Sequence, residues 1–235
     1  MADPPRDRCC DALLLALSCA AGVVDAVSYL RLGQVFTANM TGHAVLLGIA
    51  FVNADSTRIV HALLAICGFF GGAVWGSFIV DSQARTERWP KAVTQALWME
   101  SWILTLAAIA WGTPGTRFSG LVTPYIVASA VAMGLQSAAV RDLKVAGVAT
   151  TYITGTLTSL AADVVGLFRR RSRAEPPAPG GVAPLLLAGV WIVYIVGATV
   201  GAIAVKSAPS SAFAIPAALT LAVALVATRR FGRAA

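Results

Sequence analysis

Charged residues are scarce in this 235-residue sequence, in which Asp, Glu, Lys and Arg together make up only 12%. That share is about half of what a soluble domain carries. Hydrophobic residues reach 57%, and the mean hydropathy is +0.75. A chain of this composition cannot cover a water-exposed surface with polar groups. The scarcity of charge therefore excludes a soluble globular domain and favours a membrane protein.

Residues that build reactive centres are also few. The four cysteines form no Cys-x-x-Cys pair, and the two histidines with scattered acids form no metal-ligand pattern. No hydrolase, phosphate-loop or cysteine-nucleophile motif is present. We therefore expect no enzyme, no catalytic residue, no cofactor and no metal. Nucleic acid is not an expected partner either, because the net charge of +7 comes from basic residues that flank apolar segments, where anionic lipid fits better.

Long apolar segments are what the sequence has in abundance, and every Lys and Arg lies at or beyond the end of one. We predict that these segments are helices, because lipid requires the backbone polar groups to be paired within each segment. Residues 169–182, a basic run followed by Glu-Pro-Pro-Ala-Pro-Gly-Gly, are predicted as a cytoplasmic linker. The segments cover approximately residues 11–31, 35–53, 57–80, 91–112, 119–140, 147–168, 182–206 and 211–229.

A short polar motif occurs twice inside this apolar sequence. The first motif, residues 35–43, reads Val-Phe-Thr-Ala-Asn-Met-Thr-Gly-His, and the second motif, residues 148–156, reads Val-Ala-Thr-Thr-Tyr-Ile-Thr-Gly-Thr. A second matching pair, Gly72–Ser82 and Gly197–Ser207, follows in the same order without a gap. We therefore predict a single membrane domain, 1–235, made of two homologous halves, 11–112 and 119–229, joined at about 113–118.

The distribution of basic residues distinguishes two arrangements of these segments. If all eight cross the membrane, 11 of the 18 Lys and Arg lie inside; if 35–53 and 147–168 enter and leave by the same face, 14 do. The positive-inside rule favours the second arrangement. We thus predict an all-α bundle with six crossing helices, two short, broken or re-entrant helices and cytoplasmic termini; eight full spans are the alternative. Three crossings per half would make the halves inverted, a recurring transporter design.

The two motifs and several buried polar residues are the predicted site for a small polar solute. Thr, Asn and Gly suit a helix break, in which Gly42 and Gly155 allow unusual backbone geometry and the side chains bond freed backbone groups. A helix beginning there also offers amide groups to an anion. We expect a polar cavity between the motifs; dry helix packing is the alternative. The residues predicted to line the site are Asp25, Thr37, Asn39, Thr41, Gly42, His43, Glu100, Gln136, Thr150, Thr154 and Gly155.

Two carboxylates lie inside apolar segments, Asp25 in the first and Glu100 in the fourth. A charge there costs at least about 2.5 kcal/mol on insertion scales, so such groups usually face the bundle interior or a wet cavity. Either carboxylate is a candidate to bind a proton or a cation, and structural pairing with a histidine or a helix end is the alternative. Gln136 holds roughly the position in the second half that Asp25 holds in the first.

Glycines recur at every fourth residue in two of the segments, which is typical of helices that pack closely in membranes. These faces serve either the interior of the bundle or a homo-oligomer. The predicted packing positions are Gly68, Gly72, Gly76, Gly197 and Gly201.

Two stretches carry a resemblance to a known family. In the first half, Gly22-Val-Val-Asp-Ala-Val-Ser-Tyr29 leads into Val35-Phe-Thr-Ala-Asn-Met-Thr-Gly42; the second half adds Met133-Gly-Leu-Gln136 and Thr154-Gly-Thr-Leu157. With these residues the chain resembles the YoaK family of bacterial inner-membrane proteins, a domain of unknown function. The family commonly has Asn after the first Thr-Gly, where this chain has His43. The resemblance covers nearly the whole chain and implies an integral membrane protein with about six spans, without implying a substrate.

These features together predict a small secondary transporter or channel for a small polar solute in the bacterial cytoplasmic membrane, with proton coupling as one form of it. ATP-driven transport is excluded because the chain has no phosphate-binding loop. Two alternatives stay open. A membrane assembly factor or lipid-interacting scaffold would pack the motifs without a cavity, whereas an intramembrane enzyme would bring Asp25, His43 or Glu100 within hydrogen-bond reach of one another.

Overall fold

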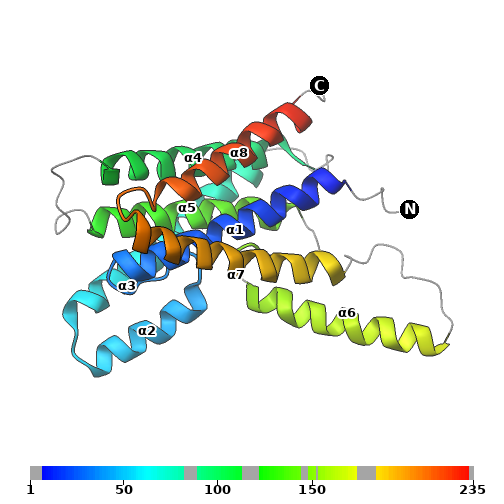
Figure 1. The fold of residues 1–235 in the computed structure, drawn as a ribbon, viewed down its shortest axis with the longest axis horizontal. Coiled ribbons are helices and arrows are strands. Elements are labelled where there is room, and N and C mark those ends of the chain that lie inside the picture. The colour runs from blue at the N-terminus through cyan, green and yellow to red at the C-terminus, as the bar shows by residue number, and fades with distance from the viewer. Residues whose placement is uncertain are drawn as a thin grey trace.

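The computed structural model describes residues 7–81, 89–112, 122–143, 148–151, 153–173 and 184–232. In these residues all regular structure is helical (Figure 1). The predicted junction at 113–118 and the linker from residue 174 onward lie outside the described residues. The helices are α1 (Arg8–Arg31), α2 (Met40–Val52), α3 (Ser56–Asp81), α4 (Lys91–Gly112), α5 (Val122–Asp142), α6 (Ile153–Arg173), α7 (Pro184–Ser207) and α8 (Ala214–Phe231).

Six of these helices, α1, α3, α4, α5, α7 and α8, are long and apolar enough to cross a membrane. α2 is apolar but has 13 residues, which gives about 20 Å of helix against a hydrocarbon core of about 30 Å. The prediction of a polytopic all-α bundle with six long apolar helices is therefore confirmed. α6 differs from the prediction, because it begins at Ile153 and continues to Arg173, so that it has 21 residues and the basic start of the predicted linker is helical.

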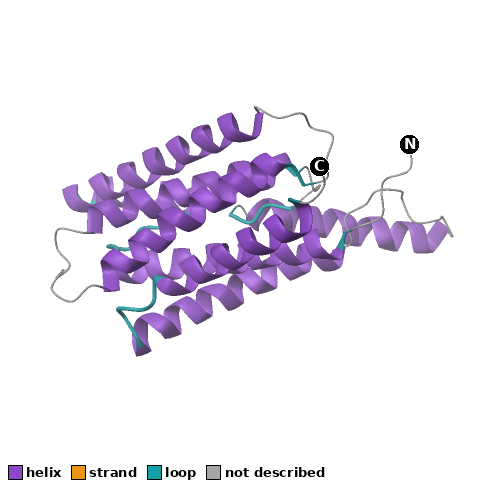
Figure 2. Ribbon diagram, turned by 90° about the horizontal axis from the view of Figure 1, so that it is seen from above, coloured by secondary structure: helices purple, strands orange, loops and turns teal. Residues whose placement is uncertain are grey.

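The helices lie alongside one another along a common long axis (Figures 1 and 2). The beginning of α1 and the end of α8 lie at the same end of the bundle (Figure 1), where Arg230 Nη2 is 3.9 Å from Asp7 Oδ2. At this end the rings of Trp89 and Phe231 also stack, with their centroids 5.1 Å apart. An even number of crossings produces this arrangement.

The tightest helix pairs join segments that are far apart in the sequence: α1 packs along α7, and α3 packs along α5. Gly72 lies against the carbonyl oxygen of Val131, and Gly197 against that of Cys19, so that a Cβ atom at either glycine would overlap the backbone of the neighbouring helix. The glycine faces therefore serve the interior of this chain. The same two interfaces also contain Gly22, Gly68, Gly76, Gly134 and Gly201.

Candidate functional site

Asp25 fixes the first motif to α1. Its Oδ1 accepts hydrogen bonds from the backbone amides of Thr37 at 3.0 Å and Ala38 at 2.7 Å, and its Oδ2 accepts from the amide of Asn39 at 3.0 Å and the hydroxyl of Tyr194 at 2.5 Å. The side chain is 3% exposed. The amide groups at this break do attract an anion, as the sequence suggests, but the anion is the carboxylate of Asp25 itself.

The rest of the first motif is held by side chains of its own segment and by α3. Asn39 Oδ1 accepts from the amide of Gly42 at 3.1 Å and so caps the beginning of α2. His43 Nδ1 accepts from the amide of Phe36 at 3.4 Å, and its Nε2 lies 3.2 Å from the carbonyl oxygen of Ala62. A carbonyl can only accept, so this pair of contacts defines a neutral imidazole protonated at Nε2. Both ring nitrogens are engaged, so His43 joins the first motif to α3.

The turn that returns the chain to Asp25 is made before the motif and not at its glycine. Gly33 has φ 82° and Gln34 has φ 62°, both in the left-handed region. Gly42 lies in the first turn of α2 without a positive φ, and a Cβ atom there would meet Asn39 Nδ2 at 3.1 Å. The prediction that Gly42 shapes the break is therefore wrong: Gly42 leaves room for the capping side chain. Gly155 likewise lies within a helix, α6.

The second motif is held by neutral groups. Gln136 Nε2 donates to Thr150 Oγ1 at 2.8 Å and to the carbonyl oxygen of Leu17 at 3.3 Å. Thr151 Oγ1 donates to Ser137 Oγ at 3.1 Å. No carboxylate takes part in these contacts, so in the part of the chain that the structure describes the second motif is anchored by an amide and hydroxyls.

In each motif a backbone amide donates a hydrogen bond to the side chain seven residues further along the chain. The amide of Ala149 donates to Thr156 Oγ1 at 3.2 Å, seven residues further on. The bond from the amide of Phe36 to His43 has the same spacing in the first motif. His43 and Thr156 therefore close equivalent seven-residue turns with different side chains.

The structure gathers some of the predicted residues and separates others. Asp25, Thr37, Asn39, Gly42 and His43 form the first polar cluster, and Gln136 with Thr150 forms the second. The side chains of Thr41 and Thr154 are exposed on the outside of the bundle, apart from both clusters. Glu100 belongs to neither cluster, and no hydrogen bond among the described residues joins Asp25, His43 and Glu100 to one another.

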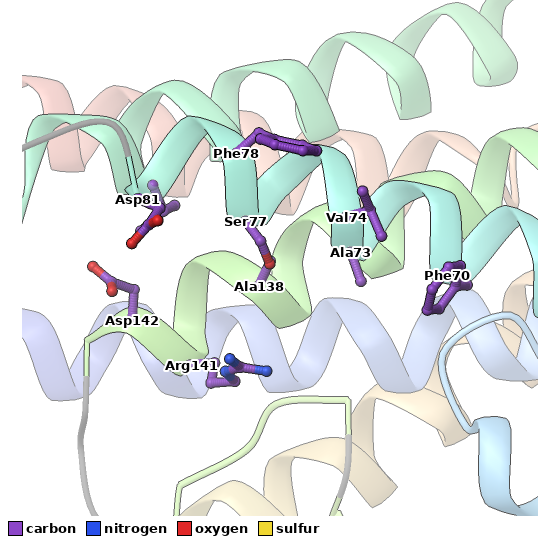
Figure 3. A pocket seen from close by; sticks show the side chains of 10 residues that line it. Phe70, Ala73, Val74, Ser77, Phe78, Asp81, Ala138, Arg141 and Asp142 are labelled. Atoms are coloured by element: carbon purple, nitrogen blue, oxygen red, sulfur yellow. The ribbon is translucent and has the colours of Figure 1, made fainter.

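The main cavities of the described residues do not include the polar cavity expected between the motifs. A space of about 30 Å³, which is large enough to hold water, lies beside His43 between α2 and α3. A larger groove of about 610 Å³ opens between α3 and α5. Figure 3 shows Asp81 and Asp142 at one end of this groove and Phe70 at the other, with Arg141 below. Neither space is lined by residues of both motifs.

Glu100 is fully buried in α4, and neither carboxylate oxygen has a hydrogen-bond partner among the described residues. Gln136 Oε1 is also buried without a partner there. Groups of three or more His, Cys, Asp or Glu able to hold a metal ion are absent from the same part of the chain.

Sequence reasoning missed three contributors: Tyr194, Ser28 and Thr156. Tyr194 donates to Asp25 from the middle of α7. A tyrosine so far from either end of an apolar segment is unlike the interfacial belt residues, and this was the available signal. Ser28 Oγ is 3.1 Å from Thr37 Oγ1 and follows Asp25 by one helical turn, a spacing that puts both on one face of α1.

Fold and site together define a multi-pass α-helical membrane protein with two polar motifs buried in its bundle.

The chain belongs to the family described as "Protein of unknown function (DUF1275)", which matches residues 13–226. It is 36% identical over 195 residues to the UPF0700 transmembrane protein YoaK of Bacillus subtilis (strain 168), with 81% of this chain and 82% of that protein covered. It is 30% identical over 215 residues to the UPF0700 transmembrane protein RA0705 of Rhizobium meliloti (strain 1021), with 91% and 84% covered. No solved structure matches. The resemblance to the YoaK family is thus confirmed.

Proposed function

We propose that this protein is a small secondary transporter or channel for a small polar solute in the bacterial cytoplasmic membrane. The observation that carries the proposal is the arrangement of the two motifs. Each motif lies against a long helix in the interior of the bundle, and the helices that follow, α2 and α6, run from the middle toward opposite ends (Figure 1). Paired broken segments of this kind occur in secondary transporters, where they form the solute site near the midplane.

Each polar cluster has a hydrogen bond to α1, so the distance between the two clusters can be measured along this helix. Asp25 bonds the first motif, and the carbonyl of Leu17 accepts from Gln136, which holds the second. The two α1 residues are eight positions apart, or about 12 Å along a helix. α1 runs from Arg8 to Arg31, so the clusters lie on either side of its centre. This is where a site alternately open to either face would be placed.

The proposal includes two homologous halves of inverted orientation. A shift of 112 residues relates Cys19 to Val131, and a shift of 125 relates Gly197 to Gly72; these are the residues that meet in the two glycine interfaces. The contacts of Gly22 with the Tyr194 carbonyl and of Gly134 with the Phe69 carbonyl obey the same two shifts. In this register Ser137, rather than Gln136, corresponds to Asp25.

Solute passage requires movement of α2 or α6, because neither space described above joins the motifs. The same dry packing favours the second candidate function, a membrane assembly factor or lipid-interacting scaffold. The two candidates differ in whether the second motif opens, so a variant of that motif separates them.

Osmotic swelling of proteoliposomes tests the transporter proposal, with urea, glycerol and glycine as separate probes. We expect swelling above protein-free liposomes for at least one probe. Thr150→Val should change that rate, since it removes the bond to Gln136. Thr158→Val is the matched control, because Thr158 is exposed and its hydroxyl donates within its own helix, to the carbonyl of Thr154. Swelling equal to that of empty liposomes with every probe would favour the scaffold.

Cysteine labelling tests the six-crossing topology. Arg58→Cys and Arg141→Cys are made in a background without the four native cysteines and labelled with a membrane-impermeant maleimide in intact cells. Arg58 lies in the first turn of α3 and Arg141 in the last turn of α5. We therefore expect the Arg58→Cys variant to be labelled from outside and the Arg141→Cys variant only after lysis. Labelling of both variants from the same face would contradict the arrangement.

A further inference from the structure

Three buried acceptor atoms in α4 and α5 have no donor among the described residues: both carboxylate oxygens of Glu100 and Oε1 of Gln136. Both side chains are 0% exposed. A buried acceptor without a donor is costly, and a buried charge without a partner more so. The three acceptors therefore point to a donor that the contacts of the described residues do not supply.

Packing places Glu100 and Gln136 at the same level of the bundle. α4 packs against α5. Leu97 belongs to one hydrophobic cluster with Ala139, and Leu104 belongs to another with Ala132. Glu100 lies between the two leucines and Gln136 lies between the two alanines, so the unpartnered groups occupy matching positions on neighbouring helices.

The chemistry of these groups fits a proton better than a metal cation. Three oxygens are too few for the six or more that Ca²⁺ or Mg²⁺ requires, and neither Glu100 nor Gln136 lines any of the cavities found in the described residues. A proton needs one oxygen and no volume. The other buried carboxylate, Asp25, already accepts four hydrogen bonds and has no free position for a proton.

We propose that Glu100 is a proton-binding site and that its protonation controls the second motif through the side chain of Gln136. The protonated acid donates to Gln136 Oε1, which leaves Nε2 directed at Thr150 Oγ1 and the Leu17 carbonyl, as observed. When Glu100 loses its proton to water, which becomes hydronium, the carboxylate and Oε1 are both acceptors and repel each other. A half-turn of the amide then presents Nε2 to Glu100 and Oε1 to Thr150, whose hydroxyl becomes the donor. The bond to the Leu17 carbonyl, which can only accept, is lost, so that the second motif and α5 are released from α1.

In the proposed transporter, the proton on Glu100 would be the coupling ion and the second motif would be the gate that it controls. This switch rests on the proposed function only for the movement of solute. Binding of the proton and release of the motif are measurable in the purified protein without any flux.

Infrared spectroscopy of the purified protein tests the proton site. We expect the wild type to show the carbonyl stretch of a protonated carboxylic acid, which disappears as the pH is raised, and Glu100→Gln to lack this titrating band at every pH. Asp55→Asn is the control variant, because Asp55 lies in the loop before α3 and pairs with Arg58; it should keep the band. A wild type without the band at any pH, or a Glu100→Gln variant that retains it, would overturn the proposal.

Hydrogen exchange of residues 148–156 tests the gate, with the first motif, residues 35–43, as the internal reference. At a pH above the titration of the infrared band, we expect the second motif to exchange about fivefold faster in the wild type than in Glu100→Gln, as the loss of about one hydrogen bond implies. The first motif should exchange equally in both. Equal exchange of the second motif in both proteins at every pH would overturn the gate.

The outcomes separate this switch from the proposed function. If the infrared and exchange results hold but no probe enters wild-type proteoliposomes, the switch stands and the transporter is rejected. If solute enters at the same rate in wild type and Glu100→Gln and no band titrates, the transporter stands and the switch is rejected.

Discussion

The two motifs occupy corresponding places in the bundle, but they are held by different chemistry. The first is bonded to a carboxylate that accepts three backbone amides and a phenol hydroxyl. The second is bonded to one amide side chain and to hydroxyls. Hydrogen bonds to a charged group contribute about 1.5–3 kcal/mol each, and neutral ones about 0.5–1.5 kcal/mol. From this comparison we expect the first motif to be held more firmly than the second.

Removing the carboxylate gives the largest expected effect. Asp25→Ala leaves four donors without their acceptor and should lower the free energy of unfolding by about 3–5 kcal/mol, because each unsatisfied buried donor costs about 1–3 kcal/mol and the costs add only in part. Unfolding in mixed detergent micelles measures this. Asp25→Asn is the milder control, since it keeps one acceptor oxygen. A loss below that of Thr150→Val would contradict the distinction between the motifs.

Tyr194→Phe comes next. It removes one hydrogen bond to the Asp25 carboxylate and should cost about 1.5–3 kcal/mol. The register of the two halves places Phe69 at the position that corresponds to Tyr194, so this variant also makes the halves more alike. The same unfolding assay measures it. Unchanged stability would show that the three backbone amides alone satisfy Asp25.

Two glycine variants test where the halves are alike. Gly72→Ala and Gly197→Ala each place a Cβ atom against a carbonyl oxygen of the neighbouring helix. Each should cost about 1–3 kcal/mol, as overpacking does, and the two losses should be similar. Gly71→Ala, which meets no atom within 4 Å, is the matched control. A large difference between the two interfaces would show that the asymmetry extends beyond the polar anchors.

Thr150→Val has the smallest expected effect on stability, about 0.5–1.5 kcal/mol, because a single neutral hydrogen bond is lost. The variant keeps the size of the side chain. Comparing its unfolding with that of Asp25→Ala gives the difference between the anchors directly. A loss as large as that of Asp25→Ala would mean that the second motif is as firmly held as the first.

The bundle itself was predictable from local properties of the sequence. Segment length, hydropathy and the positions of Lys and Arg indicate six long helices and two exceptional ones, because the bilayer imposes these properties on each segment separately. The predicted helix boundaries were less accurate where an apolar segment continues into a charged one. The basic run at 169–173 was predicted as the start of a linker, but Arg residues form helix well, and this run is the last part of α6.

The site was predictable in its residues but not in their roles. Asp25, His43 and Gln136 stand out because polar groups are rare in apolar helices. Whether a buried carboxylate accepts hydrogen bonds depends on which distant segments pack against it. Tyr194, for example, is 169 residues away from Asp25 in the sequence, so its bond to Asp25 could not be predicted. For the same reason Asp25 is a structural anchor, whereas Glu100, equally buried, is the carboxylate without a donor among the described residues.

The pairing of α1 with α7 and of α3 with α5 also dictates an order of assembly. α1 ends at Arg31, and its partner α7 does not begin until Pro184. During synthesis the glycine face of α1 therefore lacks its α7 partner until residue 184 and beyond have been made, whereas α3 and α5 are available to each other earlier. We expect α1 to be less firmly held during this interval, and the pairing with α7 to complete its packing.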